Sequence, residues 1–408
     1  MSCKPRHISK FISFFGISLS SVASFNALCI YRGDESFYSK FLMPFVSKFL
    51  DPEFAHNSCI FMTKHKLIRC QNGLNEDDAK KLKTKVFDMS FENPIGVAAG
   101  FDKNSQAVGG LNFYGLGFAE VGTVTPKPQD GNPKQRIFRV TEDKALINRC
   151  GFNNRGIEFV RETLSKFDTF KPMLVGLNIG KNKDTSNISS DYLIGLERSQ
   201  DLKSVDYLVV NISSPNTPGL RDSQEKENLS KLLDDVLAKM NSLSIKKPLL
   251  VKVAPDLTDK QLEDIALLLT KKRCGEAKVS GIILTNTTVT RPTSNKESGS
   301  SVYKEAGGLS GQPLRDMSTE IIGKFYKITN GKLPIIGVGG VFSGQDAYDK
   351  IKAGASLIQI YTSLTYEGPP IVNKIKRELV ALLDRDNLTS VEDAVGLNHR
   401  KHNKKSQV

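Results

Sequence analysis

The chain has 408 residues, and its 57 Lys and Arg against 44 Asp and Glu give a formal net charge of +13. The lysines are scattered and form no nucleic-acid recognition motif, so the charge favours an anionic lipid surface and an acidic substrate over nucleic acid. The six cysteines, at positions 3, 29, 59, 70, 150 and 274, include no CxxC pair, so neither a zinc site nor a disulfide framework is indicated and we expect no metal.

The first predicted element is an uncharged segment at Phe11–Ile30, about as long as a bilayer crossing requires. Basic residues flank it, with Lys10 before it and Arg32 after it. We interpret residues 1–32 as a targeting segment and a single membrane-spanning anchor, and the basic, acid-free first ten residues suit mitochondrial import. Several serines make the segment only moderately apolar, so a cleaved secretory signal or a targeting helix is an alternative.

Two short helices, separated near Asp51-Pro52, are predicted within Phe37–Ile68. An apolar stripe follows the first of them, formed by Phe37, Phe41, Leu42, Phe45, Val46 and Phe49. Such a stripe could pack on the rest of the protein, but directly after an anchor we expect an amphipathic helix pair that lies on the bilayer. Residues 33–75 are therefore a separate predicted domain.

The rest of the chain alternates predicted strands and helices. Apolar runs between turn signals give eight strands, at Pro94–Gly100, Phe118–Val124, Leu174–Ile179, Asp206–Ile212, Leu249–Ala254, Ser280–Thr285, Pro334–Gly339 and Ser356–Tyr361. Helical stretches follow them, including Asn228–Leu243, Thr258–Thr270, Leu314–Thr329 and Gly344–Ala353. Eight such units predict an α/β fold, a (β/α)8 TIM barrel over residues 76–384; the strand count is against a doubly wound open sheet. Residues 385–408 form a polar, basic tail.

Polar, glycine-rich or cationic residues follow every predicted strand. The carboxyl ends of barrel strands form one active face, so these residues are expected to lie together. The most informative end is Asn211–Thr217, NISSPNT, which presents two amides and two hydroxyls after an apolar strand. An Asn/Ser/Pro turn would use the same residue types, but the series of polar ends favours a substrate held by neutral hydrogen bonds.

Two further strand ends indicate a phosphate. Gly339-Gly340 and Tyr361-Thr362-Ser363 follow the seventh and eighth strands, where barrels commonly bind phosphate through backbone N–H groups and a helix N-terminus. GVGG alone is also typical of a tight turn. Lys252, on the fifth strand, adds a fixed cation that could stand near an electron-rich ring, because its apolar neighbours disfavour a snorkelling side chain.

In these motifs the chain resembles the dihydroorotate dehydrogenases, specifically the class 2, membrane-associated form that uses a quinone. The resemblance covers nearly the whole chain, from about Phe37 to Leu383. It is carried by DPEFAH (51–56), NPIGVAAGFDKN (93–104), VTPKPQ (124–129), INRCGFNN (147–154), NISSPNTPGLR (211–221), VKVAPDL (251–257), TNTT (285–288), GGLSG (307–311) and IGVGGV (336–341).

The resemblance implies FMN as cofactor and oxidation of (S)-dihydroorotate to orotate, with ubiquinone as final acceptor, in de novo pyrimidine (UMP) biosynthesis. Ser214 would be the general base, although a serine is a poor base and the sequence offers only Thr217 and water as a relay. Lys103 would face the substrate carboxylate. The other implied substrate-binding residues are Asn148, Asn211, Asn216, Asn286 and Thr287.

For the cofactor, the resemblance implies Ala98, Ala99, Gly100, Thr123, Asn178, Asn211, Lys252, Thr285, Ser310, Gly311, Gly339, Gly340, Tyr361 and Thr362. Of these, Lys252 would support the negative charge that accumulates on reduction, and the last four would hold the phosphate. His56, Arg139 and Tyr361 would line a quinone tunnel at the helix pair. The expected location is the mitochondrial inner membrane, in contact with lipid.

The chain departs from the usual family pattern at a few positions. Cys150 stands where many relatives carry tyrosine, Thr123 where serine is frequent, Glu367 where an aromatic is often found, and Ser47 where a relative can carry glutamine. Two rival functions are kept open: a nicotinamide- or fumarate-linked flavoenzyme of the same fold, and a membrane-tethered scaffold without activity. Ser214 and the N-terminal helices disfavour the nicotinamide- or fumarate-linked enzyme. The complete set of polar site residues disfavours the inactive scaffold.

Overall fold

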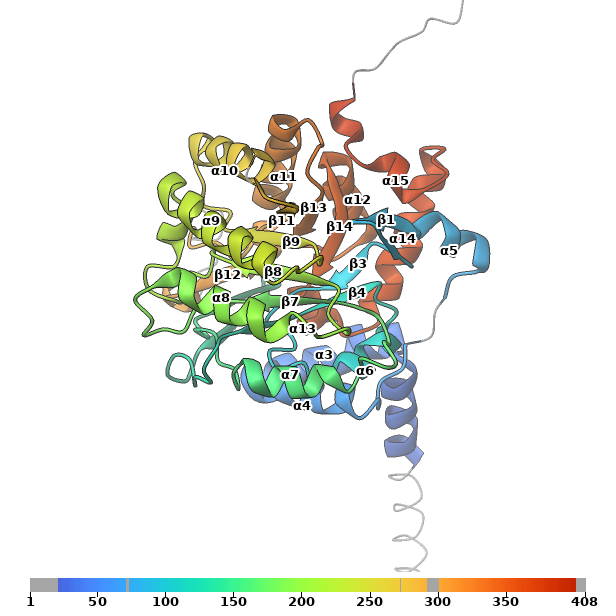
Figure 1. The fold of residues 1–408 in the computed structure, drawn as a ribbon. Helices are drawn as coiled ribbons and strands as arrows, with labels where there is room; N and C mark the ends of the chain where they lie inside the picture. The colour runs from blue at the N-terminus through green and yellow to red at the C-terminus, as the bar shows by residue number, and fades with distance from the viewer. Residues whose placement is uncertain (1–20, 71–72, 272, 292–300, 401–408) are drawn as a thin grey trace, which may run out of the picture.

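A closed barrel of eight parallel strands forms the centre of the computed structural model, which describes residues 21–70, 73–271, 273–291 and 301–400 (Figure 1). The ring closes because the last strand pairs with the first and each neighbour pairs in parallel. This confirms the predicted TIM barrel. In ring order its strands are β3 (Ile95–Val97), β4 (Phe118–Val124), β7 (Leu174–Ile179), β8 (Tyr207–Asn211), β9 (Leu249–Val253), β11 (Ala277–Leu284), β13 (Ile335–Val338) and β14 (Ala355–Ile360).

The predicted strand bounds agree with the structure to different degrees along the barrel. β4 and β7 have the predicted limits, whereas the first predicted strand is shorter, since Ala98–Gly100 already belongs to the following loop. The sixth begins earlier than predicted, at Ala277, because a short antiparallel partner, β10 (Arg273–Cys274), extends it.

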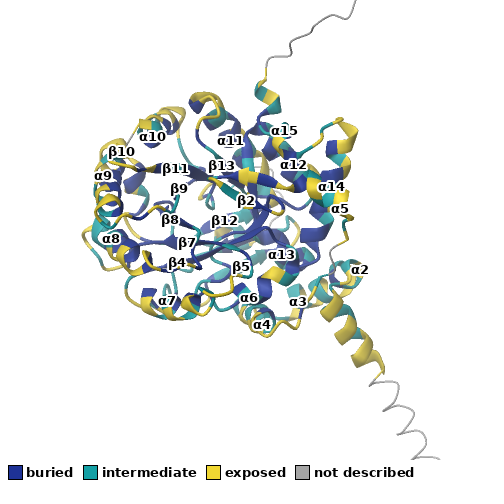
Figure 2. Cartoon of the chain, turned by 45° about the vertical axis from the view of Figure 1, so that its right-hand side comes forward, coloured by how far each residue is buried: buried dark blue, intermediate teal, exposed yellow. Residues whose placement is uncertain are grey.

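Helices surround the barrel on the outside, and their inner faces are buried against the strands (Figure 2). Strand residues alternate between two cores: Leu208 and Val210 pack toward the helices, while Tyr207 and Val209 fill the barrel interior. The outer helices are α6 (Val108–Leu111), α7 (Ile157–Ser165), α8 (Ile188–Ser199), α9 (Lys226–Ser242), α10 (Asp259–Lys271), α11 (Arg315–Thr329), α12 (Gly344–Ala353) and α14 (Ile371–Arg385). Shorter helices are α5 (Glu76–Leu82), α13 (Thr362–Glu367) and α15 (Val391–Ala394).

An antiparallel hairpin closes the amino-terminal end of the barrel. It consists of β1 (Thr84–Val86) and β2 (Met89–Phe91), joined by Phe87 and Asp88, both with positive φ as a type I′ turn requires. Phe91 packs edge-on against Phe118 of β4, with ring centroids 5.5 Å apart. The hairpin therefore keeps water from this end of the barrel interior.

A three-stranded antiparallel sheet lies outside the barrel ring, formed by β5 (Ile137–Val140), β6 (Ala145–Asn148) and β12 (Gly308–Gly311). The sequence reading did not predict this sheet. Its pairing places Gly308 opposite Asn148 and Ser310 opposite Leu146, so two loops distant in sequence are held together. Predicted site residues on both loops thereby reach the same region.

The N-terminal helices follow the predicted division. After a helical segment at 21–32, the chain forms the continuous run α2 (Glu35–Phe37), η1 (Tyr38–Leu42) and α3 (Met43–Phe49), and then α4 (Pro52–Lys64). The break falls at Asp51, whose carboxylate accepts a hydrogen bond from Phe54 N at 2.8 Å and caps α4, with Pro52 in its first turn. The predicted split near Asp51-Pro52 is confirmed.

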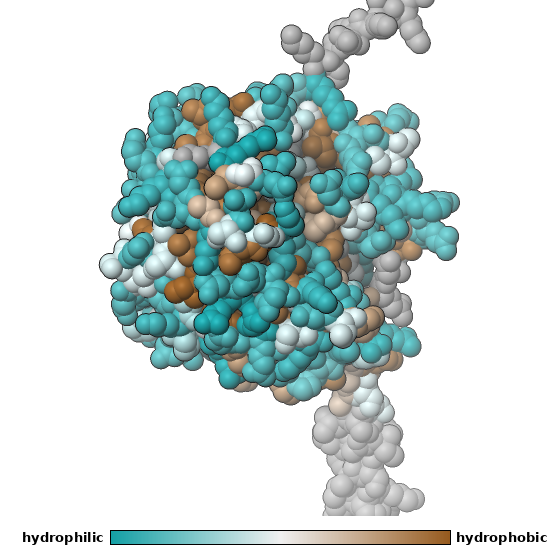
Figure 3. Space-filling model, viewed as in Figure 1, coloured by the Kyte–Doolittle hydropathy of each residue, from teal (hydrophilic) through white to brown (hydrophobic). Residues whose placement is uncertain are grey.

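Large apolar side chains of these helices are exposed. Phe41, Phe45 and Phe49 on the first helical run are 65%, 55% and 62% exposed, and Phe54 and Phe61 on α4 are similarly accessible. Figure 3 shows apolar residues at the surface where the N-terminal helix joins the body of the molecule. The side of the stripe formed by Phe41, Phe45 and Phe49 therefore does not pack on the barrel, whereas Phe37, Leu42 and Val46 are half-buried.

The predicted anchor lies largely outside the described residues. Only 21–30 of the segment Phe11–Ile30 belong to the described chain, as do only 385–400 of the predicted tail. The described part of this tail is not a free polar segment as predicted, because it contains α15, whose residues Val391 and Ala394 are buried in the hydrophobic core. Among the described helices, none combines the length and the apolar character that a membrane crossing requires.

Candidate active site

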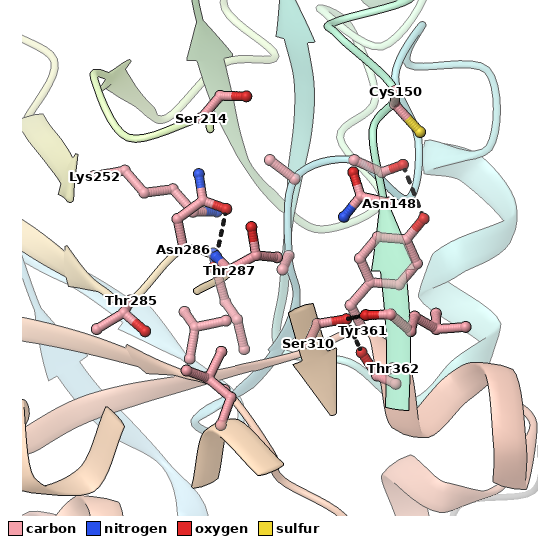
Figure 4. Close-up of a pocket in the computed structure, with 18 of the residues that line it drawn as sticks. Asn148, Cys150, Ser214, Lys252, Thr285, Asn286, Thr287, Ser310, Tyr361 and Thr362 are labelled. Carbon is pink, nitrogen blue, oxygen red and sulfur yellow. Dashed lines mark hydrogen bonds between the residues drawn. The ribbon is translucent and has the colours of Figure 1, made fainter. Parts of the chain in front are cut away.

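A cavity opens at the carboxyl ends of the strands, with about 1180 Å³ of empty space including its mouth. Its walls come from β-strand ends and from β6 and β12, and Figure 4 shows Ser214, Lys252 and Asn286 on one side and Asn148, Cys150 and Tyr361 on the other. The predicted residues that line it are Ala98, Ala99, Gly100, Lys103, Thr123, Asn148, Asn211, Ser214, Asn216, Lys252, Thr285, Asn286, Thr287, Ser310, Gly339, Gly340, Tyr361 and Thr362.

Two predicted cofactor residues do not line this cavity. Asn178 lies below its floor, where the Asn178 side-chain oxygen accepts hydrogen bonds from Thr123 Oγ1 at 2.6 Å and from Asn211 Nδ2 at 3.2 Å. Gly311 lies at the end of β12, next to the lining residue Ser310. Asn178 therefore orients two cavity residues instead of facing the cavity itself.

The loops after β8 and β11 are tied together by side chains. Asn286 Nδ2 donates to Ser213 Oγ at 2.9 Å, and Ser213 Oγ donates to Asn211 Oδ1 at 2.9 Å. Arg221 reinforces the link, since it donates to the carbonyls of Ser213 and Thr287. These bonds fix the amides of Asn211 and Asn286 before any ligand is bound.

The opposite wall is held by a second set of contacts. Asn216 Nδ2 donates to the backbone carbonyl of Asn148 at 3.1 Å and to its side-chain oxygen at 3.2 Å. Lys103 Nζ donates to Gly100 O at 2.8 Å, and burial lowers the pKa of the Lys103 ammonium. Ser214 lies on the side of the cavity opposite Asn148 in Figure 4, and its Oγ accepts a hydrogen bond from Asn216 N at 3.3 Å.

One end of the cavity is built from glycine backbone and hydroxyl groups. Gly339 and Gly340 have φ of +123° and +69°, and a Cβ on Gly340 would lie 2.5 Å from Arg315 Cβ, so only glycine fits there. Thr362 Oγ1, in the first turn of α13, donates to Ser310 Oγ at 2.9 Å (Figure 4). Backbone N–H groups, small residues and hydroxyls together suit an anion.

The three predicted quinone-tunnel residues lie between the helices and the barrel. His56 of α4 packs against Phe101 and Tyr361, with ring centroids 5.6 Å and 6.4 Å away. Burial, and next the nearby Lys103 ammonium, lower the His56 pKa to about 3, so this imidazole is neutral. Arg139 lies farther out, where its guanidinium donates to Leu50 O at 2.6 Å at the end of α3.

Sequence reasoning missed residues inside the barrel and at the far end of the cavity. Glu120 on β4 is fully buried and ion-paired with Lys252, and Gln359 on β14 lines the cavity. Both residues lie within apolar strand patterns. A single polar residue in such a pattern does not indicate which residue it will contact in the folded protein. Ser363 also lines the cavity; it had been noted in the phosphate motif but not assigned a role.

A family model described as dihydroorotate dehydrogenase matches residues 81–383. The chain belongs to the dihydroorotate dehydrogenase family. It is similar to a protein of Mus musculus named dihydroorotate dehydrogenase (quinone), mitochondrial, with 46% identity over 377 residues, which is 90% of this chain and 92% of the relative. It is equally similar, at 46% identity, to a dihydroorotate dehydrogenase (quinone) of Xanthobacter autotrophicus, over 86% of this chain and 97% of the relative.

A solved structure supports the same assignment. A dihydroorotate dehydrogenase of Eimeria tenella, crystallised with ferulenol, superimposes with a TM-score of 0.80 at 40% identity, covering 88% of this chain and 98% of that one. Glu367, which stands where relatives often carry an aromatic residue, forms an ion pair in this structure: Lys144 Nζ lies 2.5 Å from its carboxylate. Cys150 is a partly buried cavity residue, and burial raises the pKa of its thiol.

Proposed function

We propose that this protein oxidises dihydroorotate to orotate in pyrimidine biosynthesis, with FMN as the bound hydride acceptor and ubiquinone as the final acceptor. The observation that carries the proposal is the convergence of Ser214, Lys103 and four asparagine amides on one cavity of a family member. A neutral amide array beside the Lys103 cation suits a cyclic imide that bears a carboxylate.

The residues present fit FMN. Two buried hydroxyls that line the cavity, Thr285 Oγ1 and Ser363 Oγ, have no hydrogen-bond partner among the described residues, and a ligand with several acceptors would satisfy them. Gly339, Gly340 and Thr362 form the anion-binding end, suited to the phosphate, and Lys252 faces the region left for the ring system. When bound, FMN supplies the acceptor for two electrons and a hydrogen.

The protein groups position the substrate and move its proton. Lys103 pairs with the substrate carboxylate, while Asn148, Asn216 and Asn286 bind its ring N–H and C=O groups. Ser214 Oγ removes the proton from the carbon next to the one that loses hydride, so the substrate gives up one proton and one hydride. Because serine is weakly basic, its proton must leave through a relay; Thr217, itself buried in the same loop, is the candidate in the chain.

The helix pair serves the second half of the cycle. We assign residues 33–75 to a quinone-access domain, in which His56, Tyr361 and Arg139 line the route and the exposed phenylalanines of α3 and α4 contact lipid. Relatives named as mitochondrial favour a mitochondrial location. We further propose that residues 1–32 anchor the protein in the inner membrane, with the barrel at 76–384 outside the bilayer.

Acceptor choice distinguishes this function from a nicotinamide- or fumarate-linked one. Orotate formation from dihydroorotate should proceed with a short-chain ubiquinone and be at background with NAD⁺ or fumarate. Turnover with fumarate or NAD⁺ but not with quinone would reject the quinone assignment. A protein that binds FMN yet turns over with none of the three would instead support the scaffold alternative.

A further inference from the structure

Glu120 is a carboxylate inside the barrel, below the cavity and above the apolar layer formed by Phe118, Tyr207 and Leu250. Its exposure is 0%, and it does not line the cavity. A charged carboxylate is costly at such a dry position unless other groups compensate it. The groups that contact Glu120 therefore indicate its role.

Three strands supply the contacts of this carboxylate. Lys252 Nζ of β9 lies 3.2 Å from Oε1, to which Asn178 Nδ2 of β7 also donates at 2.7 Å. Gln359 Nε2 of β14 donates to the other oxygen, Oε2, at 2.6 Å. The carboxylate thus has one cationic and two neutral donors, and both of its oxygens are occupied.

Lys252 contacts Glu120 and also lines the cavity. Its side chain is 5% exposed, yet it lines the cavity, so its charge lies between Glu120 and the bound ligand. The Glu120 carboxylate, 3.2 Å away, fixes the position of the Lys252 amino group. Of the three donors, Lys252 is the one that carries a charge at the cavity wall, while Gln359 lines the cavity as a neutral amide and Asn178 holds Thr123 and Asn211.

We propose that Glu120 is a positioning residue that holds the Lys252 ammonium in place under the flavin and thereby raises the reduction potential of the bound cofactor. The inference rests on the proposed FMN site. A fixed cation stabilises the negative charge that the ring gains on reduction, and Glu120 lies 3.2 Å from that cation in the barrel interior.

The test is the midpoint potential of the flavin in Glu120→Gln, measured on the FMN-loaded full-length protein. The change removes the charge but keeps the shape, and Gln359 Oε1, which lacks a partner among the described residues, can accept from the new amide after the Gln359 amide rotates. We expect the equilibrium to shift at least about tenfold toward oxidised flavin, a fall of about 30 mV for two electrons. Lys252→Met should lower the potential similarly, and the double variant should fall no further.

Two control measurements keep the inference open to contradiction. Asp191→Asn alters a buried carboxylate that caps a loop near α8, and it should leave the potential unchanged. If the Glu120→Gln variant loses its FMN, the flavin midpoint potential of Lys252→Met is compared with that of the double variant, in which no unpaired charge is buried. The two potentials should be equal.

An unchanged or raised potential in Glu120→Gln would overturn the inference, as would a further fall on adding Glu120→Gln to Lys252→Met. Either result would mean that Glu120 does not act through the charge of Lys252. A parent protein that binds no flavin would instead reject the proposed cofactor, so the two failures are distinguishable.

Discussion

Ser214 and Lys103 were predicted from strand-end position and family resemblance, and the structure brings both to one cavity. Their neighbours were harder to foresee. Glu120 appears in the sequence as one acidic residue in an apolar run, and its counter-ion lies 132 positions away. Asn178 was expected to touch the cofactor but lies below the floor, because its side chain is already held by Thr123 and Asn211. Sequence identifies which residues are polar at a strand end, and packing decides which of them face the ligand.

The first residue-scale prediction concerns Ser214→Ala. The variant should still bind FMN and orotate, because the asparagine amides are held by Ser213, Asn148 and Arg221 and do not depend on the Ser214 hydroxyl. Flavin reduction by dihydroorotate should slow by at least about 10²-fold, as expected for loss of a positioned base. Stopped-flow absorbance checks this, with Ser214→Cys as the variant that keeps an ionisable group. Reduction at the parent rate would place the base elsewhere.

A second prediction concerns Lys103, the partly buried cation of the cavity. Lys103→Ala should weaken orotate binding by roughly 10- to 100-fold, because it removes a charge-assisted hydrogen bond worth about 1.5–3 kcal/mol. Lys127→Ala is the matched control, since that lysine is exposed on a loop of the same face. Orotate affinity is read by titration of the flavin spectrum; loss of FMN with orotate affinity intact would assign Lys103 to the cofactor.

At the scale of elements, the eight strands were predictable because buried parallel strands read as continuous apolar runs between turn signals. The antiparallel sheet of β5, β6 and β12 was not, since its strands are four residues each and are set by pairing between segments far apart in sequence. The β1–β2 hairpin was also missed, because its turn uses Phe87 and Asp88 where a glycine would have been the signal. The helix break at Asp51 was predictable from its cap and Pro52.

The attachment of α4 to the barrel gives the third prediction. Glu53 and Arg136 form a two-pronged ion pair, with Nη2 to Oε1 at 2.6 Å and Nε to Oε2 at 3.2 Å. Glu53→Gln should release α4, because breaking a largely buried pair costs about 3–5 kcal/mol. Quinone should then reoxidise the flavin more slowly, with reduction by dihydroorotate near the parent rate.

Lys134→Gln is the control for this pair. Lys134 is 71% exposed and 3.9 Å from Glu53, so its loss should have little effect. Both half-reactions are followed in stopped flow. Equal quinone rates in Glu53→Gln and Lys134→Gln would show that the pair does not hold the helix in its working position.

The fourth prediction is a pH dependence from His56 of α4. Its pKa is about 3 in the folded protein and about 6.5 when unfolded, so between these values only the unfolded chain takes up the proton. Stability should therefore fall as the pH drops below about 6.5, by up to about 2 kcal/mol between pH 7 and pH 5. Urea unfolding in detergent at a series of pH values measures this change in the free energy of unfolding. His56→Phe should reduce the pH dependence of the unfolding free energy. His65→Gln, at the exposed end of the same helix, should leave it unchanged. The same pH dependence in both variants would exclude His56 as its source.

At the scale of the whole molecule, substrate groups lie on barrel loops and exposed aromatic side chains lie on the N-terminal helices. This separation was visible in the sequence, because the apolar stripe precedes the first barrel strand. Under the proposed function, this separation would divide the catalytic cycle between a barrel in which the flavin is reduced and a helix pair through which electrons leave to the quinone.

The fifth prediction separates these two parts by truncation. Deletion of residues 1–32 should give a more soluble protein that still uses short-chain quinones. Deletion through Ile68 should leave flavin reduction by dihydroorotate in the folded fraction but abolish reoxidation by quinone, because His56 and the rest of α4 are lost. Reoxidation of the longer truncation as fast as the shorter one would mean that the helices do not form the quinone site.

The most direct test of the central claim follows the flavin bands of the intact protein in the absence of oxygen. Dihydroorotate should bleach the bands with formation of an equal amount of orotate, and a following addition of ubiquinone should restore them. A chromophore that dihydroorotate does not bleach would contradict the proposed function, and bands that stay bleached with quinone would contradict the acceptor.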